Sequence, residues 1–104
     1  MMWQFSKNEV MERLSKVIDP ELQINIVALG LIYNVYLEEE FVRVVMTLTS
    51  PGCPLAPVIN MMVGEVLADL PGFDPNKLII DVTFDPPWTP EMMTAEAKAE
   101  LGMD

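Results

Sequence analysis

The residue in this sequence best suited to chemistry is its single cysteine, Cys53, because a thiolate can ligate metals and attack electrophiles. Gly52 and Pro54 flank the thiol, which indicates a tight turn at the start of a predicted helix. A thiol there faces unpaired backbone N–H groups and the positive end of the helix dipole, which favour the thiolate form. The alternative interpretation is a buried cysteine that packs as a small hydrophobic side chain.

The chain contains no histidine, and this narrows the chemistry open to Cys53. A cysteine hydrolase needs a base beside the thiol, and a zinc site needs several Cys or His ligands. An iron–sulfur cluster normally takes four thiolates. Cys53 can therefore hold a cluster only by sharing it with a second copy of the chain, a small thiol or a partner protein. Such sharing indicates transient carriage of a cluster or of iron.

Several polar residues are candidates to lie around the thiol. Asp19 and Glu21 follow the first predicted helix and are either ordinary turn residues or oxygen ligands and hydrogen-bond acceptors beside Cys53. Hydroxyl side chains that precede the cysteine are either ordinary strand residues or donors to a sulfide or thiolate. These hydroxyl residues are Thr47, Thr49 and Ser50.

An apolar group near the carboxyl terminus also has two interpretations. Trp88, Met92 and Met93 either fill part of the core or form an exposed apolar surface for a partner protein.

Composition limits the class of protein. A chain of 104 residues, 51% of them hydrophobic, is expected to form one domain over residues 1–104. The net charge of −10 argues against nucleic acid and anionic membranes as partners. The sequence has no signal-peptide pattern and no apolar run long enough to span a bilayer. One cysteine excludes an intrachain disulfide, so we expect a reducing compartment, the cytoplasm.

Hydrophobic periodicity predicts the elements that position these residues. The first helix is expected to begin at a capping box of Ser6 and Glu9 and to end at Asp19-Pro20. The later elements are expected to be strands 31–37, 41–49 and 78–85, with helices 54–70 and 90–101. One face of the second strand is predicted to pack under the helices: Val42, Val44, Met46 and Leu48. The order α-β-β-α-β-α predicts an α+β two-layer sandwich, a three-stranded sheet with helices on one face.

Four motifs in order carry a resemblance to a known family. They occupy residues 19–22 (DPEL), 29–33 (LGLIY), 47–54 (TLTSPGCP) and 84–93 (FDPPWTPEMM). Together they closely resemble the iron–sulfur cluster assembly domain family, the metal–sulfur cluster biosynthetic proteins related to PaaD and SufT. The resemblance implies the fold of that domain and Cys53 as the key thiol. By motif position it also implies Asp19, Glu21, Thr47 and Thr49 around the thiol.

The chain departs from the family pattern at one position. Many relatives carry an acidic residue directly before Leu-Gly-Leu, where this chain has Ala28. A metal-binding role for that position is therefore not expected here. The extra cysteine-bearing tail of some PaaD-type members is also missing, which favours a stand-alone factor.

The combined prediction is a non-enzymatic factor that assembles or transfers iron–sulfur clusters, with iron or a cluster bound transiently at Cys53. Its expected partners are an Fe–S scaffold or client apo-proteins, with a homodimer favoured if two chains share one cluster. The alternative is a metal-free adaptor that docks clients to the assembly machinery through Trp88, Met92 and Met93. A thiol enzyme or redox sensor is disfavoured by the missing histidine and missing resolving cysteine.

Overall fold

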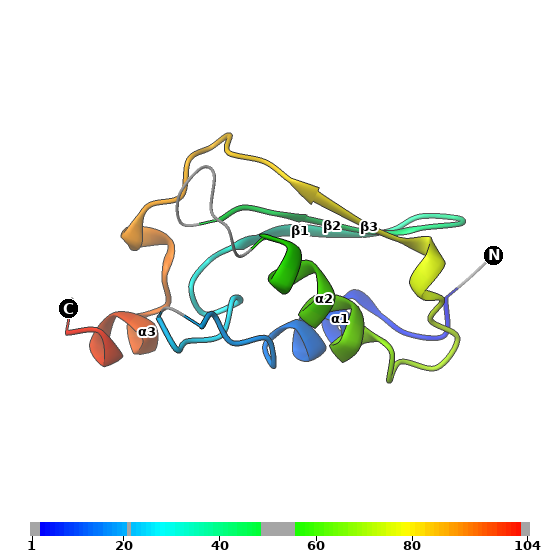
Figure 1. The fold of residues 1–104 in the computed structure, drawn as a ribbon, viewed down its shortest axis with the longest axis horizontal. Coiled ribbons are helices and arrows are strands. Elements are labelled where there is room, and N and C mark those ends of the chain that lie inside the picture. Colours follow the sequence, from blue (N-terminus) through cyan, green and yellow to red (C-terminus); the bar gives the residue numbers. More distant parts are fainter. Residues whose placement is uncertain (1–2, 21, 49–55, 103–104) are drawn as a thin grey trace.

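The computed structural model describes residues 3–20, 22–48 and 56–102. The element order confirms the predicted α-β-β-α-β-α, with two short 3₁₀ helices added (Figure 1). The elements are α1 (Lys7–Leu14), β1 (Ile32–Leu37), β2 (Val42–Met46), α2 (Ala56–Leu67), η1 (Pro75–Lys77), β3 (Leu78–Val82), η2 (Pro90–Met92) and α3 (Ala95–Glu100).

The sheet has the strand order β1-β2-β3. β1 and β2 form an antiparallel hairpin across the exposed residues 38–40, whereas β2 and β3 are parallel and connected through α2. Figure 1 shows α1 and α2 under the same face of the sheet, and α3 past the end of the sheet on that side. This arrangement confirms the predicted two-layer sandwich.

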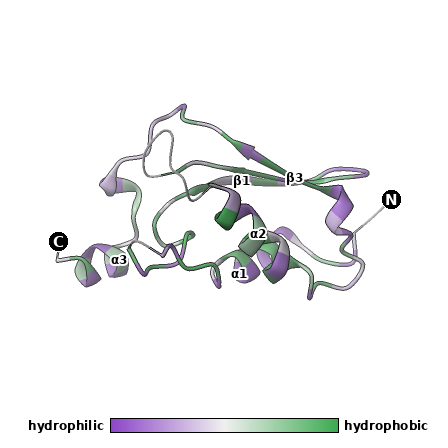
Figure 2. Cartoon of the chain, viewed as in Figure 1, coloured by the Kyte–Doolittle hydropathy of each residue, from purple (hydrophilic) through white to green (hydrophobic). Residues whose placement is uncertain are grey.

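The core lies between the sheet and the two helices. Val42, Val44, Met46 and Leu48 are all buried, so the predicted inner face of β2 is confirmed. Figure 2 shows hydrophobic residues running along the strands and through α2. The helix residues that close the core are Val10 and Leu14 of α1 and Ile59, Val63 and Leu67 of α2.

The first helix is shorter than predicted. α1 ends at Leu14, and the Ser15 hydroxyl donates to the backbone carbonyl of Glu12 at 2.6 Å. The chain then turns back, because the N–H of Ile26 donates to the carbonyl of Val17 at 2.9 Å. Val17 stays buried at its helical spacing, but Ile18 is 43% exposed and forms a bridge with Asn25. Hydrophobic periodicity alone could not reveal this backbone pairing.

The carboxyl-terminal segment also differs from the prediction. The single helix expected over 90–101 is two pieces, η2 and α3, separated by extended backbone at Met93. Thr94 caps α3, since its hydroxyl accepts the Ala97 N–H at 3.1 Å, whereas Thr89 makes no side-chain cap. Ahead of this segment β3 ends at Val82, short of the strand predicted over 78–85, and Phe84 beyond its end is 40% exposed.

Candidate functional site

The predicted site centres on a segment that joins β2 to α2. Cys53 belongs to this segment, and it lies outside the described residues together with Glu21, Thr49 and Ser50. The described elements on either side show where the segment begins and ends: it follows the carboxyl end of β2 and precedes the first turn of α2. Because β2 and β3 are parallel, this is the end of the strands where open α/β sheets bind their ligands.

Asp19 is held in a tight turn at the start of the loop that follows α1. Its side chain is buried, with 4% of the residue exposed, and its Oδ1 accepts the N–H of Leu22 at 3.0 Å. Two backbone hydrogen bonds close the turn. The Asp19 N–H donates to the Ile24 carbonyl at 3.0 Å, and the Gln23 N–H donates to the Asp19 carbonyl at 2.7 Å. Asp19 is thus a turn residue in the structure, and its role as a ligand stays a prediction.

Thr47 directly follows β2 and is fully buried. Its N–H donates to the carbonyl of Leu31 at 2.8 Å, and its hydroxyl donates to the carbonyl of Leu48 at 3.4 Å. By strand alternation Thr47 faces away from the helices, so its burial was not predicted from the pattern. The structure brings it to the end of the sheet from which the cysteine segment leaves.

Residues 83–94 are hydrogen-bonded to β1 and to the loop that leads into it. The indole N–H of Trp88 donates to the carbonyl of Leu29 at 2.7 Å, and the Tyr33 hydroxyl donates to the carbonyl of Pro86 at 2.7 Å. The Thr94 N–H donates to the carbonyl of Ala28 at 2.9 Å. Two of the resembling motifs, 29–33 and 84–93, therefore contact each other in the fold.

The two methionines of the predicted partner surface lie at different depths. Met93 is 5% exposed and belongs to the core, so the core interpretation holds for this residue and it is not available to a partner. Met92 is partly buried, with its sulfur 3.7 Å from the Tyr33 hydroxyl. Trp88 is partly buried and packs against the core. A partner surface at Trp88 and Met92 stays a prediction.

Replacing Trp88 with phenylalanine is expected to lower the free energy of unfolding by about 1–2 kcal/mol, because the Leu29 carbonyl loses its donor in a part-buried setting. Trp3 provides a matched control, since its indole donates to the carbonyl of Glu38 at the same 2.7 Å but at an exposed position. Trp3→Phe should cost less, because water can replace the lost donor. Urea denaturation of both variants measures the two free energies of unfolding. Equal losses of stability would show that the part-buried hydrogen bond of Trp88 matters no more than the exposed one of Trp3.

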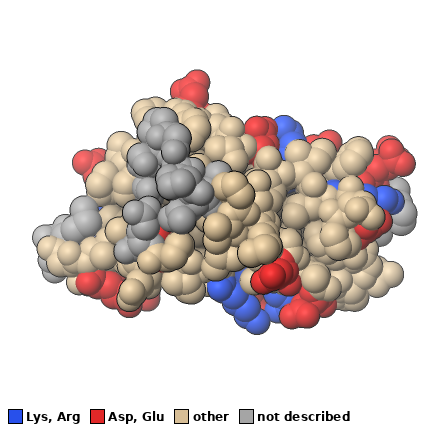
Figure 3. All heavy atoms as spheres, viewed as in Figure 1, with Lys and Arg blue, Asp and Glu red and all other residues tan. Residues whose placement is uncertain are grey.

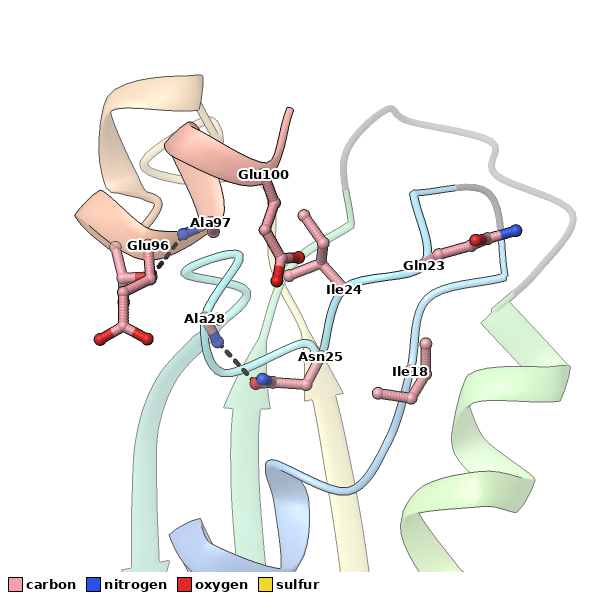
Figure 4. Close-up of a pocket in the computed structure, with 9 residues that line it drawn as sticks. Ile18, Gln23, Ile24, Asn25, Ala28, Glu96, Ala97 and Glu100 are labelled. Carbon is pink, nitrogen blue, oxygen red and sulfur yellow. Dashed lines mark hydrogen bonds between the residues drawn. The ribbon is translucent and has the colours of Figure 1, made fainter. Parts of the chain in front are cut away.

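A cavity of about 250 Å³ lies between α3 and the loop after α1 (Figure 4). Figure 4 shows Glu100 reaching from α3 toward Ile24, while the Gln23 side chain points away. Sequence reasoning missed this cavity, because its outer wall depends on the break that Thr94 imposes before α3. The lining residues are Ile18, Gln23, Ile24, Asn25, Ala28, Thr94, Glu96, Ala97 and Glu100.

The described residues contain no group of three or more His, Cys, Asp or Glu side chains that could enclose a metal ion. Nor does any helix among them have the length and apolar character needed to cross a membrane. Figure 3 shows acidic groups at many separate points and no continuous basic stripe on the visible face.

Comparison with known proteins gives a consistent result. The model of the "Iron-sulfur cluster assembly protein" family matches residues 7–77. A Bacillus subtilis protein, "Fe-S protein maturation auxiliary factor YitW", is 44% identical over 93% of this chain and 94% of its own. The Staphylococcus aureus "Fe-S protein maturation auxiliary factor SufT" is 48% identical over 84% of this chain and 98% of its own. A Bacillus anthracis domain of unknown function superposes with a TM-score of 0.86, at 39% identity over 94% and 92% of the two chains.

Proposed function

The chain belongs to the iron–sulfur cluster assembly protein family, and from that premise we propose that it receives iron or an iron–sulfur cluster on the Cys53 thiolate and passes it to another protein. The metal is cargo in this proposal, held transiently and released. One thiol per chain suits that role, because a cage of four thiolates from one chain would release its cargo slowly.

The observation that carries the proposal is the connection that holds the cysteine. The segment runs from the carboxyl end of β2 to the first turn of α2, a helix of 12 residues in the crossover between parallel strands. Unpaired N–H groups at the start of such a helix favour a thiolate and a negatively charged sulfide cluster. No charged residue occurs between Thr47 and Asn60, so nearby carboxylates from this stretch would not oppose the anionic form.

Asp19 and Glu21 are proposed to complete or tune the site with carboxylate oxygens, and Thr47, Thr49 and Ser50 to donate hydrogen bonds to thiolate or sulfide. The burial of Asp19 would suit a site from which water is largely excluded. The turn that holds Asp19 also fixes where its carboxyl group lies, which suits a ligand that must not rearrange.

Two substitutions of Asp19 separate its structural role from the proposed chemical one. Asp19→Asn keeps an oxygen that accepts the Leu22 N–H, so we expect wild-type stability within about 0.5 kcal/mol but weaker iron binding. Asp19→Ala removes the acceptor and should also lower the free energy of unfolding by about 1–2 kcal/mol. Urea denaturation and anaerobic iron titration give the two readouts. Unchanged iron binding in Asp19→Asn would leave Asp19 as a turn residue only.

The proposed partners are a scaffold protein that supplies the cargo and apo-proteins that accept it. The protein would act without catalysing a reaction of its own, and it would work in the cytoplasm, where a lone thiol stays reduced. The names of the relatives, maturation auxiliary factors, support an accessory role of this kind.

Anaerobic loading tests the proposal. The wild-type chain is incubated with ferrous iron, sulfide and a thiol, and bound iron and sulfide are then counted after desalting. We expect cysteine-to-iron charge-transfer absorption together with bound iron. A colourless protein without iron would contradict the proposal and favour the metal-free adaptor, whose docking would then depend on Trp88.

A further inference from the structure

The cavity between α3 and the loop after α1 has an apolar floor. Ile24 and Ala97 both line it although only 6% and 2% of these residues are exposed, so they lie at its base. Ile18, which is 43% exposed, lies at its mouth. Pockets for drug-sized ligands generally enclose about 300–1,000 Å³. A cavity of about 250 Å³ is therefore better matched to a single side chain.

Two carboxylates stand over this apolar floor. Glu96 and Glu100 are four residues apart on α3, and Figure 4 shows both side chains extending from the same side of that helix. Both residues are exposed, and neither forms an ion pair within the described residues. Lys98 is two residues from each of them, so it projects from another side of α3, and it does not line the cavity. The negative charge at the cavity is thus not neutralised by a neighbouring cation.

The remaining polar groups do not favour an anion. The Thr94 hydroxyl accepts the Ala97 N–H at 3.1 Å, so the amino end of α3 does not offer this donor to a ligand. Asn25 is held in place, because its Oδ1 accepts the Ala28 N–H at 2.8 Å. The two carboxylates would repel a negative group. The lining therefore selects a ligand with an apolar stem and a positively charged head.

We propose that this cavity receives an arginine side chain presented by a partner protein. The aliphatic stem of the arginine packs on the apolar floor, and its guanidinium binds Glu96 and Glu100 at the mouth. A guanidinium suits two carboxylates on successive turns, because its five N–H donors lie in a planar fork. The ammonium of a lysine is a compact point charge and cannot present donors to both in this way.

The charges also indicate that the arginine belongs to a polypeptide. Free arginine carries an α-carboxylate, and no Lys or Arg among the described residues lines the cavity to bind it. Glu96 and Glu100 would repel that carboxylate, whereas within a peptide chain it is replaced by a neutral amide. The net charge of −10 on this chain further favours approach of a basic protein surface.

A partner held at the cavity would lie next to the turn that contains Asp19. Ile18 directly precedes Asp19, and the Gln23 N–H donates to the Asp19 carbonyl at 2.7 Å. The cavity and the candidate site thus share one loop. Binding of the arginine requires neither Cys53 nor any cargo, so it can be measured on the metal-free protein and separately from iron loading.

Titration with a capped arginine tests the proposal. The probe is Nα-acetyl-arginine N-methylamide, added to the ¹⁵N-labelled metal-free protein at low salt and followed by NMR. We expect saturable shifts of the backbone amides of Asn25, Ala28 and Ala97, with a Kd of about 1 mM. The citrulline analogue has nearly the same shape without the charge and should bind about fivefold more weakly or worse. The lysine analogue and free arginine should also bind more weakly.

A pair of double variants tests the role of the two carboxylates. Glu96→Gln combined with Glu100→Gln should weaken binding of the arginine probe about fivefold or more. Glu65→Gln combined with Glu91→Gln is the matched control, because it changes the net charge equally at exposed positions outside the cavity. The control should bind within about twofold of wild type. The amide spectra of both double variants show whether they are folded.

Several results would overturn the proposal. An arginine probe that produces no saturable shift of the three amides at about 20 mM would show that the cavity does not bind this side chain. Equal affinity for the citrulline or lysine probe would show that the guanidinium is not recognised, and equal affinity for free arginine would remove the reason for a polypeptide. Equal losses in the two double variants would show that only overall charge matters.

Discussion

Replacing Cys53 with alanine is expected to abolish transfer of iron or a cluster to an apo-protein, while the free energy of unfolding changes by less than about 1 kcal/mol. The chain has no second cysteine and no histidine that could take over the cargo. The expected loss is therefore complete rather than partial. The measurement is the rate at which an apo-acceptor gains its cluster when incubated with loaded wild-type or variant protein.

Cys53→Ser is the matched control for this variant, because serine keeps a hydrogen-bonding group at the same position in a side chain of similar shape but is a far weaker iron ligand. Both variants should fail in transfer and both should fold. If Cys53→Ala were inactive and Cys53→Ser active, a polar contact at this position, rather than thiolate ligation, would explain the loss.

Replacing Gly30 with alanine is expected to destabilise the fold strongly. Gly30 has a φ of +80°, a conformation that costs an L-residue about 1–2 kcal/mol. An added Cβ would also lie 2.8 Å from the backbone carbonyl carbon of Met92 and would clash with its oxygen. Relief of that contact requires residues 83–94 to shift, which adds about 1–3 kcal/mol. Urea denaturation should therefore show a loss of about 2–5 kcal/mol.

Gly64→Ala supplies the internal comparison, since Gly64 lies within α2 and an added Cβ there would meet nothing within 4 Å. Alanine should stabilise the helix by about 0.5–1 kcal/mol. Opposite signs for the two glycine substitutions are expected. A Gly30→Ala protein as stable as wild type would show that the packing of Met92 against this loop does not matter for folding.

Local sequence signals predicted those parts of the fold that depend on neighbouring residues. The capping box at the start of α1 is present in both directions, with the Ser6 hydroxyl accepting the Glu9 N–H and the Glu9 carboxylate accepting the Ser6 N–H. The alternation along β2 gave the buried face correctly, because one side of the strand packs on helices and the other does not. These features need no knowledge of distant segments.

Features that depend on long-range pairing were not predictable in the same way. α1 ends early because Val17 accepts a hydrogen bond from Ile26, and α3 begins late because Thr94 contacts Ala28 as well as capping the helix. The depth of Met93 follows from the same contact, since the extended backbone there turns its side chain into the core. Each outcome depended on a contact with a residue more than eight positions away, or on which of two threonines caps the helix.

The same distinction between local signals and long-range contacts applies to the candidate site. Residue types around Cys53 were enough to single out the thiol, because its flanking glycine and proline and the missing histidine are local facts. The burial of Asp19 and Thr47 became visible only in the fold, where a turn and the end of the sheet enclose them. The cavity beside α3 depended on the placement of that helix and carried no recognisable signal in the sequence.

An anaerobic transfer assay with the loaded wild-type protein and an apo-acceptor separable by size tests most directly whether Cys53 carries iron or a cluster to another protein. Iron and sulfide are counted on both proteins over time, with a chelator present to remove free iron. We expect that iron lost from the wild-type chain appears on the acceptor, and that Cys53→Ala neither loads nor transfers. Equal maturation of the acceptor by Cys53→Ala would contradict a carrier role for the Cys53 thiolate.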